Sequence, residues 1–334
     1  MRLSAFSIVD PPDPHVPSPS RLPEVVGLAR ACEQGGLSAL WVAEHHFQSG
    51  GGCPSPPVLL AACGAVTRTL RLGSMVSVLP YHRPIDVAEE YATLDRLLEG
   101  RLNFGVGSGY LATELEAFAV DPARKRSLFD DGLEFILAAF AGRAVRPAGA
   151  DGPSVRLNVL PAQQPHPPVW IAVQRREAIA HVARKGYSIA LVPYATVADR
   201  RELAEEIAEY RAQLPPGQTG EVAVALHVYA GDRVAEARTA FARYVRSRHD
   251  TGSTFLQAKA DRNPRSTSPE SIERSGLALF GDVETVLAGL GELESLGIDE
   301  LLAIFDFGGL SPELVHRSVT TVGRAWADRV RSAA

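Results

Sequence analysis

The chain has 334 residues, which is enough for one large domain or two of ordinary size. Apolar residues make up 46% of it and charged residues 22%, as in ordinary globular proteins. The net charge of -5 and the lack of a basic run give no reason to expect nucleic acid, and no apolar window of about 18 residues predicts a membrane span.

Short β-type runs alternate with longer segments of helical periodicity along the whole chain. In the first half we expect strands at 2–9, 38–43, 70–79 and 101–108, and helices at 20–35, 56–67, 84–98 and 125–141. In the second half we expect strands at 168–173, 187–193, 221–229 and 299–308, and helices at 175–185, 197–213, 233–248, 282–296 and 312–330.

This alternation amounts to about eight strand–helix pairs. Strands such as VWIAV and LLAIF are apolar throughout, which is typical of strands that are buried on both faces. The count and the length favour a closed (β/α)8 barrel, a TIM barrel, formed by one domain over residues 1–334. An open doubly wound sheet is the structural alternative.

Two segments interrupt the pattern. Residues 143–167 are rich in Gly and Pro and predict an insertion after the fourth helix. Residues 249–276 are polar and turn-rich, and such a long irregular segment after the seventh strand predicts a mobile lid loop.

Three cysteines without metal-ligand spacing indicate reduced thiols in a cytoplasmic protein, and no other metal motif is apparent. The first residues also lack the charged leader and apolar stretch of a signal peptide.

The second expected strand ends in an acid and two imidazoles, Glu44, His45 and His46, before a loop of Gly and Pro. In a barrel this loop lies at the C-terminal ends of the strands, where catalytic groups gather. One histidine would act as a general acid–base because its pKa is near neutrality. The alternative is that the imidazoles only hydrogen-bond loop backbone, with Glu44 orienting a histidine or accepting a backbone N–H.

The segment NFGVGSGY places Gly105, Gly107 and Gly109 at the end of the fourth strand. Glycine lets the backbone approach a flat ring or a phosphate closely. The spacing differs from the dinucleotide-binding fingerprint, so we reject a dinucleotide fold. Tight packing within the protein is the alternative.

The segment AVQRREA joins the fifth strand to a helix. A helix N-terminus suits a phosphate, and Arg175 and Arg176 would add charge, although a solvated basic helix start is the alternative. Two further histidines, His82 after the third strand and His227 within the seventh, would line the mouth of the barrel or serve only in turns and in the core.

Three stretches together resemble the bacterial luciferase-like flavin monooxygenases: WVAEHHF, the block SVLPYHRPIDVAEEYATLDRLLEGRLNFGVGSGY, and FDFGGLSPELVHRSV. The resemblance covers nearly the whole chain. Within the superfamily, LPYHRPIDVAEE is most similar to the subgroup found with natural-product biosynthesis enzymes.

This resemblance implies a TIM barrel, often dimeric, that binds reduced FMN delivered by a separate flavin reductase. Oxygen would add at C4a of the flavin, and the resulting hydroperoxide would oxidise a small organic, natural-product-like substrate. His45 matches the catalytic histidine of the family, with Glu44 beside it. Met75 and Val76 match the site of a non-prolyl cis peptide under the flavin ring.

Further positions correspond to residues that would bind the cofactor and the substrate. Ser108 matches the position at which luciferases carry a phosphate-binding Arg, and Gln174 and Arg175 match a Glu-Ser pair that contacts the phosphate. We further expect flavin contacts from Gly107, Gly109 and Tyr110 and substrate contacts from His46, His82 and His227.

Two other functions stay open at the level of sequence. Relatives on this barrel include reductases that use the deazaflavin F420, although the intact EHH stretch favours FMN. The departures at Ser108 and Gln174 also allow a barrel that has lost flavin and only binds a ligand or partner.

Overall fold

The computed structural model describes residues 1–10, 21–47, 52–147, 151–250 and 267–333. Eight parallel strands form a closed barrel, because the last strand pairs with the first strand on one side and with β8 on the other. The barrel strands are β1 (Arg2–Ser7), β2 (Ala39–Val42), β3 (Arg71–Ser74), β5 (Leu102–Gly107), β6 (Val169–Val173), β7 (Ser188–Leu191), β8 (Val222–Ala230) and β10 (Glu300–Ile304). The predicted (β/α)8 barrel is confirmed, and the open sheet is wrong.

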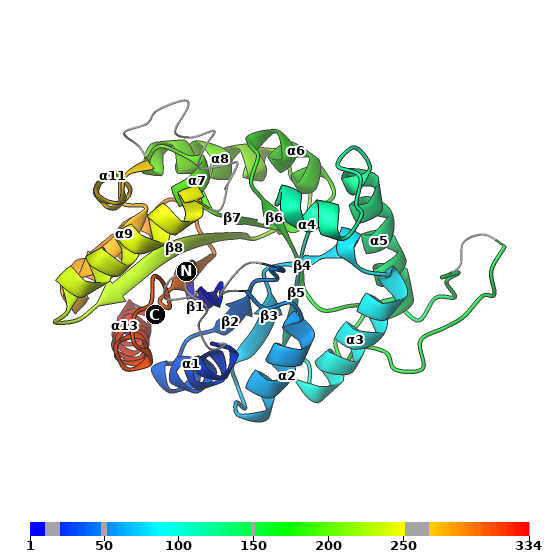
Figure 1. Ribbon diagram of the computed structural model, residues 1–334, viewed down its shortest axis with the longest axis horizontal. Helices are drawn as coiled ribbons and strands as arrows, with labels where there is room; N and C mark the ends of the chain where they lie inside the picture. The colour runs from blue at the N-terminus through cyan, green and yellow to red at the C-terminus, as the bar shows by residue number, and fades with distance from the viewer. Residues whose placement is uncertain (11–20, 48–51, 148–150, 251–266, 334) are drawn as a thin grey trace.

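Helices surround the barrel in chain order (Figure 1). The long ones are α1 (Leu22–Gly35), α2 (Pro56–Ala65), α3 (Pro84–Leu97), α5 (Lys125–Phe140), α6 (Arg176–Arg184), α8 (Arg200–Ala212), α9 (Val234–Asp250), α12 (Val283–Glu294) and α13 (Pro312–Ala333). Local chemistry fixes several of their ends. The carboxylates of Asp199 and Asp282 accept backbone N–H bonds in the first turns of α8 and α12, and α1 stops at Gly36 in the left-handed conformation.

Short elements lie in the connections after the strands, and the sequence predicted none of them except β4, which falls inside the strand expected at 70–79. They are β4 (Ser77–Val78), the 3-10 turn η1 (Leu79–Tyr81), α4 (Ala112–Ala117), α7 (Pro193–Thr196), α11 (Pro269–Arg274) and β9 (Ala278–Gly281). β9 pairs with the second half of β8, beyond the register in which β8 pairs with β10. Each spans two to six residues, so none could show a periodic pattern.

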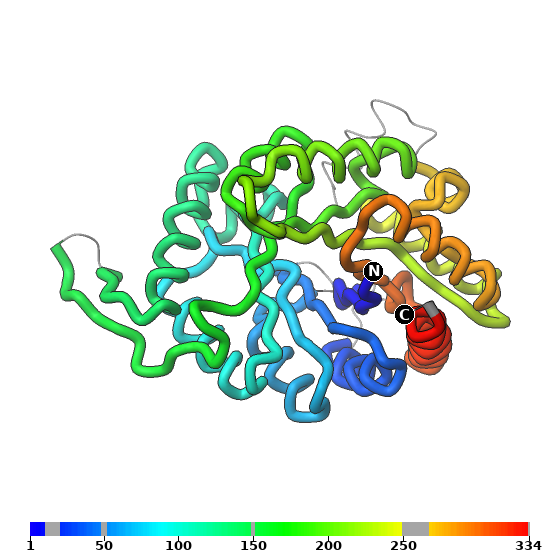
Figure 2. The backbone as a smooth tube through the Cα atoms, turned by 180° about the vertical axis from the view of Figure 1, so that it is seen from behind, coloured from blue at the N-terminus to red at the C-terminus, as the bar shows by residue number. Residues whose placement is uncertain are grey.

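The two predicted irregular segments differ in outcome. Within 143–167 the described residues contain one antiparallel bridge, between Val145 and Val155, and the segment loops out beside α3 and α5 (Figures 1 and 2). The prediction of an irregular stretch at 249–276 is wrong at its ends, since α9 continues to Asp250 and α11 lies inside it. Residues 251–266, the centre of the expected lid, are outside the described residues.

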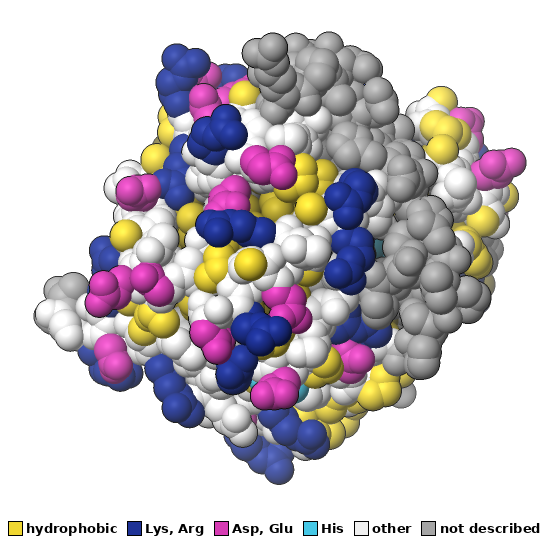
Figure 3. All heavy atoms as spheres, turned by 60° about the vertical axis from the view of Figure 1, so that its left-hand side comes forward, with side chains coloured by type: hydrophobic (Ala, Val, Ile, Leu, Met, Phe, Trp, Pro, Cys, Tyr) yellow, Lys and Arg dark blue, Asp and Glu magenta, His cyan; other side chains and the backbone are white. Residues whose placement is uncertain are grey.

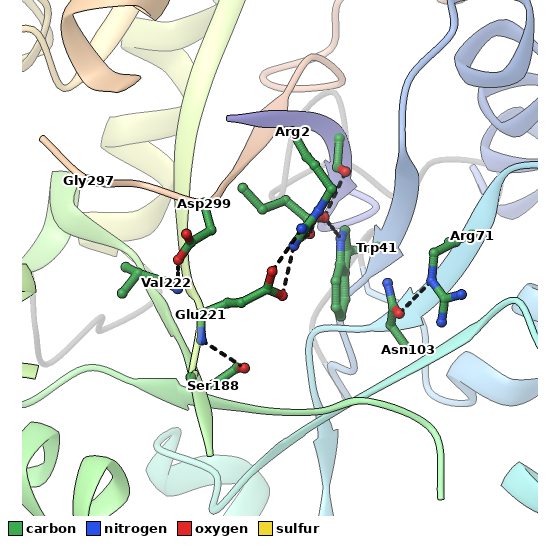
Figure 4. A network of polar contacts seen from close by, with 12 residues as sticks. Arg2, Trp41, Arg71, Asn103, Ser188, Glu221, Val222, Gly297 and Asp299 are labelled. Carbon is green, nitrogen blue, oxygen red and sulfur yellow. Dashed lines mark hydrogen bonds and ion pairs between the residues drawn. The ribbon is translucent and has the colours of Figure 1, made fainter. Parts of the chain in front are cut away.

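A polar network closes the barrel at the N-terminal ends of its strands (Figure 4). This end is opposite the loops that follow the strands. The buried carboxylate of Glu300 accepts hydrogen bonds from Arg2 at 3.0 and 3.1 Å, from the Ser4 hydroxyl at 2.7 Å and from the Trp41 indole at 2.9 Å. Arg2 also forms a bidentate pair with Glu221. A buried charge is tolerated only when it is paired and hydrogen-bonded, so this network holds three strands in register.

The face turned forward in Figure 3 carries basic and acidic side chains interspersed among apolar ones, rather than a large basic patch. None of the described helices combines the length and the apolar composition that a membrane crossing requires.

Candidate functional site

His45 lies just beyond the C-terminal end of β2, as expected. The preceding strand is held by a backbone bond from Ala43 N–H to the Ser7 carbonyl, and His45 N–H donates to the carbonyl of Cys53 at 3.2 Å. Its ring nitrogen Nδ1 is 3.2 Å from the carboxylate of Glu114, a residue of α4. Because a carboxylate accepts, Nδ1 carries the proton and Nε2 is the nitrogen that remains for chemistry.

Glu114 is a buried acid that organises this side of the barrel mouth. Its side chain is 3% exposed. Besides facing His45, it accepts the backbone N–H of His46 at 2.8 Å and the hydroxyl of Tyr81 at 3.3 Å. Burial and the adjacent Glu114 raise the pKa of Tyr81, so its hydroxyl keeps its proton as a donor. Glu114 therefore fixes both the ring and the backbone of the EHH stretch.

Glu44 orients the other two histidines rather than His45. Its Oε1 atom is 3.0 Å from Nε2 of His46 and 2.7 Å from Nε2 of His82, and its Oε2 accepts the N–H of Val78 at 3.0 Å. Burial raises the pKa of this carboxyl, but the bonds from His46 and His82 outweigh it and hold the pKa below its usual value. The pKa of His82 is raised because its bond to Glu44 outweighs its partial burial.

Within the described part of the chain, these three residues are also the one group of potential metal ligands that lie close enough together to share an ion. Donor atoms of Glu44, His46 and His82 lie within 4.8 Å of one another. However, the 2.7 Å contact is that of a charge-assisted hydrogen bond, shorter than the roughly 3.3 Å between two ligands of a tetrahedral zinc ion. We therefore interpret the set as a hydrogen-bonded clamp on β4.

An aromatic cluster packs around His46. Phe118 contacts His46 edge-on at 4.7 Å between ring centroids and stacks on Tyr81 at 4.6 Å. His46 is buried and His82 is partly buried. Substrate contacts from these two histidines remain predictions.

The Met75–Val76 peptide bond is cis, as the resemblance implied. The glycines on β5 and just after it are explained by packing within the protein. A Cβ atom on Gly105 would lie 2.0 Å from the Ser74 carbonyl oxygen, one on Gly107 would lie 2.6 Å from the Val76 side chain, and one on Gly109 would lie 2.6 Å from the Tyr81 hydroxyl. Flavin contacts from Gly107 and Gly109 remain predictions.

Two cations, Arg175 and Lys125, lie within electrostatic reach of each other, and Arg175 is where the sequence predicted a phosphate site. Arg175 is exposed at the N-cap position of α6, which has no side-chain cap. Lys125, at the start of α5, donates to the Gly109 carbonyl at 2.7 Å, and burial together with the charge of Arg175 lowers its pKa. No acidic partner of either residue is found in the described ranges. Arg176, in contrast, is exposed and paired with Glu209 at 2.8 Å.

Ser108, Tyr110 and Gln174 are all partly buried. Ser108 directly precedes Gly109, the residue that Lys125 contacts. Tyr110 meets His45 edge-on at 6.1 Å between ring centroids. His45 is therefore linked through Tyr110 and Gly109 to Lys125, which together with Arg175 forms the basic pair.

His227 lies apart from the other histidines, inside a cluster of aromatic rings. Tyr194, Tyr244 and Phe307 surround it at 4.5–5.2 Å between ring centroids, and neither of its nitrogens has a hydrogen-bond partner in the part of the chain that is described. Burial, with a further effect of Arg248, lowers its pKa to about 3. It is therefore neutral at pH 7.

The sequence profile of the family described as luciferase-like monooxygenase matches residues 1–300. The chain belongs to the luciferase-like monooxygenase family. The predicted resemblance is thereby confirmed.

Several relatives of this luciferase-like chain are known by sequence. An uncharacterised protein of Sinorhizobium fredii is 32% identical over 57% of this chain and 54% of its own length. The oxygenase component of a flavin-dependent trigonelline monooxygenase from Acinetobacter baylyi is 22% identical over 85% of this chain and 83% of its own. The chain thus spans about half the length of the first of these relatives.

Solved structures share the fold of this family member. Monooxygenase RslO1 from Streptomyces bottropensis has a TM-score of 0.79 at 22% identity, covering 99% of this chain and 100% of its own. The oxygenating constituent of 3,6-diketocamphane monooxygenase from Pseudomonas putida, solved with FMN, has a TM-score of 0.79 at 16% identity and covers 97% of each chain. An F420-dependent secondary alcohol dehydrogenase has a TM-score of 0.70 at 13% identity, covering 96% and 98%.

Sequence reasoning missed Glu114, Lys125 and Arg248. Glu114 lies on α4, in the connection after a Gly-rich strand end, and an acid in the connection after a barrel strand is a usable signal. Lys125 begins a helix and looked like an ordinary solvated residue. Arg248 was assigned only to the end of a helix.

Proposed function

We propose that the protein is the oxygenase of a two-component system, an FMN-dependent monooxygenase that oxidises a small organic substrate of natural-product type. Reduced FMN would come from a separate flavin reductase. The observation that carries this proposal is the pairing of His45 with buried Glu114 at the C-terminal mouth of the barrel. That pairing presents one imidazole nitrogen of defined protonation, which acid–base chemistry requires.

The residues present fit the phosphate of FMN. Lys125 and Arg175 repel each other, and a phosphate dianion between them would relieve that repulsion. The uncapped N-terminus of α6 adds unpaired backbone N–H groups, and Ser108 adds a hydroxyl donor. This donor set supplies the charge that luciferases take from an arginine at the position of Ser108.

The ring of the flavin would be held by the segment around Met75 and Val76, by Gly107 and Gly109, and by Tyr110. The Tyr110 ring contacts His45, and Tyr110 directly follows Gly109, whose carbonyl binds Lys125. A cofactor that spans these groups would bring its reactive portion toward the imidazole. The family resemblance supports this orientation.

When bound, reduced FMN supplies the electrons that activate dioxygen. His45 then holds or releases a proton at Nε2, while Glu114 keeps the proton of Nδ1 in place. The buried rings of Tyr81 and His46, together with Phe118, limit access of water from this side. Glu44 contributes indirectly, because its hydrogen bonds fix the positions of His46 and His82.

We further propose a cytoplasmic homodimer. The side chains of Val58 on α2 and Leu97 on α3 are 71% and 66% exposed, and a second copy would cover such apolar groups. Sedimentation of the Val58→Asp variant tests this, because a dimer through this face would dissociate.

Anaerobic titration with reduced FMN and with reduced F420 tests the proposed cofactor. We expect a micromolar dissociation constant for FMN and binding of F420 that is at least about tenfold weaker. Tighter binding of F420 would favour an F420-dependent oxidoreductase. Binding of neither cofactor at micromolar concentration would favour a barrel that has lost flavin.

A further inference from the structure

A second polar cluster is built around Arg248, in the last turn of α9. Its Nη2 atom donates to the carboxylate of Asp10 at 3.1 Å, and the two side chains are 11% and 4% exposed. Asp10 follows β1, and its second carboxylate oxygen accepts the N–H of Gly308 at 3.2 Å. The ion pair therefore joins α9 to the ends of β1 and β10.

Aromatic side chains surround the guanidinium group. It lies 5.1 Å from the centroid of the Tyr244 ring, within the range of a cation–π contact. The hydroxyl of Tyr244 is 2.8 Å from that of Tyr194, and His227 packs against both rings. The cluster thus combines one cation with two tyrosine hydroxyls and flat apolar surfaces.

Arg248 has a donor that the described residues leave unused. Its Nε atom is buried and lacks a hydrogen-bond partner within the described ranges. A buried charged donor without an acceptor is costly, so an oxygen atom of a bound ligand would stabilise it. Asp10 does not fill this role, because it binds Nη2 and Gly308.

This cluster adjoins the mouth that contains His45. Burial raises the pKa of Tyr110 to about 12, and the nearby charge of Arg248 opposes that rise. Tyr110 in turn contacts His45. Burial likewise raises the pKa of Asp10, and the charge of Arg248 opposes that rise, with smaller effects from Gly308, Arg21 and His45. Arg248, Asp10, Tyr110 and His45 therefore lie within electrostatic reach of one another.

We infer that Arg248 is a specificity-determining residue that binds the carboxylate of an aromatic or unsaturated organic acid. The body of that acid packs on Tyr110, which is partly exposed and contacts His45, so the acid lies beside His45. Asp10 holds the guanidinium group and leaves Nε to donate to the ligand. This inference rests on the proposed function and names the substrate class of the same site.

The test compares 2-naphthoate with its neutral methyl ester by isothermal titration, in the presence and absence of oxidised FMN. The variants are Arg248→Gln, Arg248→Lys and, as a matched control, Arg243→Gln, an exposed arginine on the same helix. We expect the wild type and R243Q to prefer the acid by at least about tenfold, and R248Q to lose that preference. Equal binding of acid and ester by the wild type overturns the inference.

A preference that persists in R248Q also overturns it, as does an R248Q variant that loses FMN affinity rather than acid affinity, which would make Arg248 a flavin contact. Circular dichroism reports whether R248Q folds. If it does not, R248K decides, because lysine keeps the charge near Asp10 but loses the Nε–H. Its affinity for the acid should fall about three- to tenfold with the ester unchanged, and an unaltered affinity contradicts the inference.

A wild type that prefers the acid but does not bind FMN would count against the proposed function and leave the carboxylate site standing. A wild type that binds FMN with no preference for the acid would overturn the carboxylate site and leave the proposed function standing.

Discussion

Nδ1 of His45 lies 3.2 Å from the carboxylate of Glu114, although 69 residues separate the two in the chain. His45 follows the second strand of the barrel and Glu114 lies on the helix after the fourth barrel strand, so closure of the barrel brings them together. The same carboxylate binds the backbone of His46 and the hydroxyl of Tyr81. The acid therefore determines both where the imidazole lies and which nitrogen carries its proton.

Replacing Glu114 with Gln should release this control. An amide can accept only through its oxygen and carries no charge, so the preference for a proton on Nδ1 weakens. Long-range ¹H–¹⁵N NMR of protein labelled at histidine should show a mixture of His45 tautomers in the variant and one tautomer in the wild type.

Glu116→Gln is the matched control, because Glu116 is exposed on the same helix. Glu114→Asp should partly restore the wild-type spectrum. A His45 signal that is identical in wild type and E114Q would remove Glu114 from the positioning role.

Lys125→Gln and Arg175→Gln should each weaken FMN binding. If each makes a charge-assisted bond to phosphate, the loss is about 1.5–3 kcal/mol, or roughly 10- to 100-fold in the dissociation constant. Arg124→Gln changes an exposed neighbour and should have no effect. Riboflavin, which has no phosphate, should bind wild type and variants alike; equal losses for riboflavin and FMN would mean that these cations do not bind the phosphate.

Two acids of the polar network bind Arg2, and replacing them should lower the free energy of unfolding by very different amounts. Glu300 is buried, and Glu300→Gln leaves the guanidinium without its buried counter-charge, so the free energy of unfolding should fall by about 3 kcal/mol. Glu221 is exposed, and Glu221→Gln should cost less than about 1 kcal/mol. Urea unfolding of both variants measures the difference, and equal losses would contradict the importance of burial.

His227 should make the free energy of unfolding depend on pH in the acidic range. Its pKa is about 3 in the folded protein and 6.5 in the unfolded chain, so below pH 6.5 only the unfolded chain takes up this proton. The contribution of neutral His227 is complete above pH 6.5 and declines by about 1.4 kcal/mol per pH unit down to pH 3. His227→Phe should remove this slope from the difference in unfolding free energy between variant and wild type, and parallel pH profiles would contradict it.

The eight strands and the long helices could be predicted because their signals are local. Continuous apolar runs mark strands buried on both faces, and helical periodicity marks the layer around them. β9 and α4 escaped prediction because four to six residues carry no period and their positions are set by packing. Position at a strand end pointed to the pair His45 and His46, and the family resemblance selected His45 from it.

The partners of that histidine could not be predicted, because they depend on contacts between distant segments. Glu114 and Lys125 come from loops and helices whose approach is fixed only when the barrel closes. Glu44 illustrates the same limit. The sequence predicted that it would orient a histidine or accept a backbone N–H, and it does both, since it binds His46, His82 and the N–H of Val78. Which histidines it would bind could not be predicted.

The central claim is that His45 acts on reduced FMN held at this mouth. Stopped-flow absorbance should therefore follow anaerobic protein loaded with reduced FMN as it is mixed with oxygen, for the wild type and for His45→Gln. We predict that the bound flavin reoxidises more slowly than free flavin, and that His45→Gln changes this rate by about 10²- to 10⁴-fold with an unchanged dissociation constant for FMN. Reoxidation at the rate of free flavin, or at one rate in both proteins, would contradict the account.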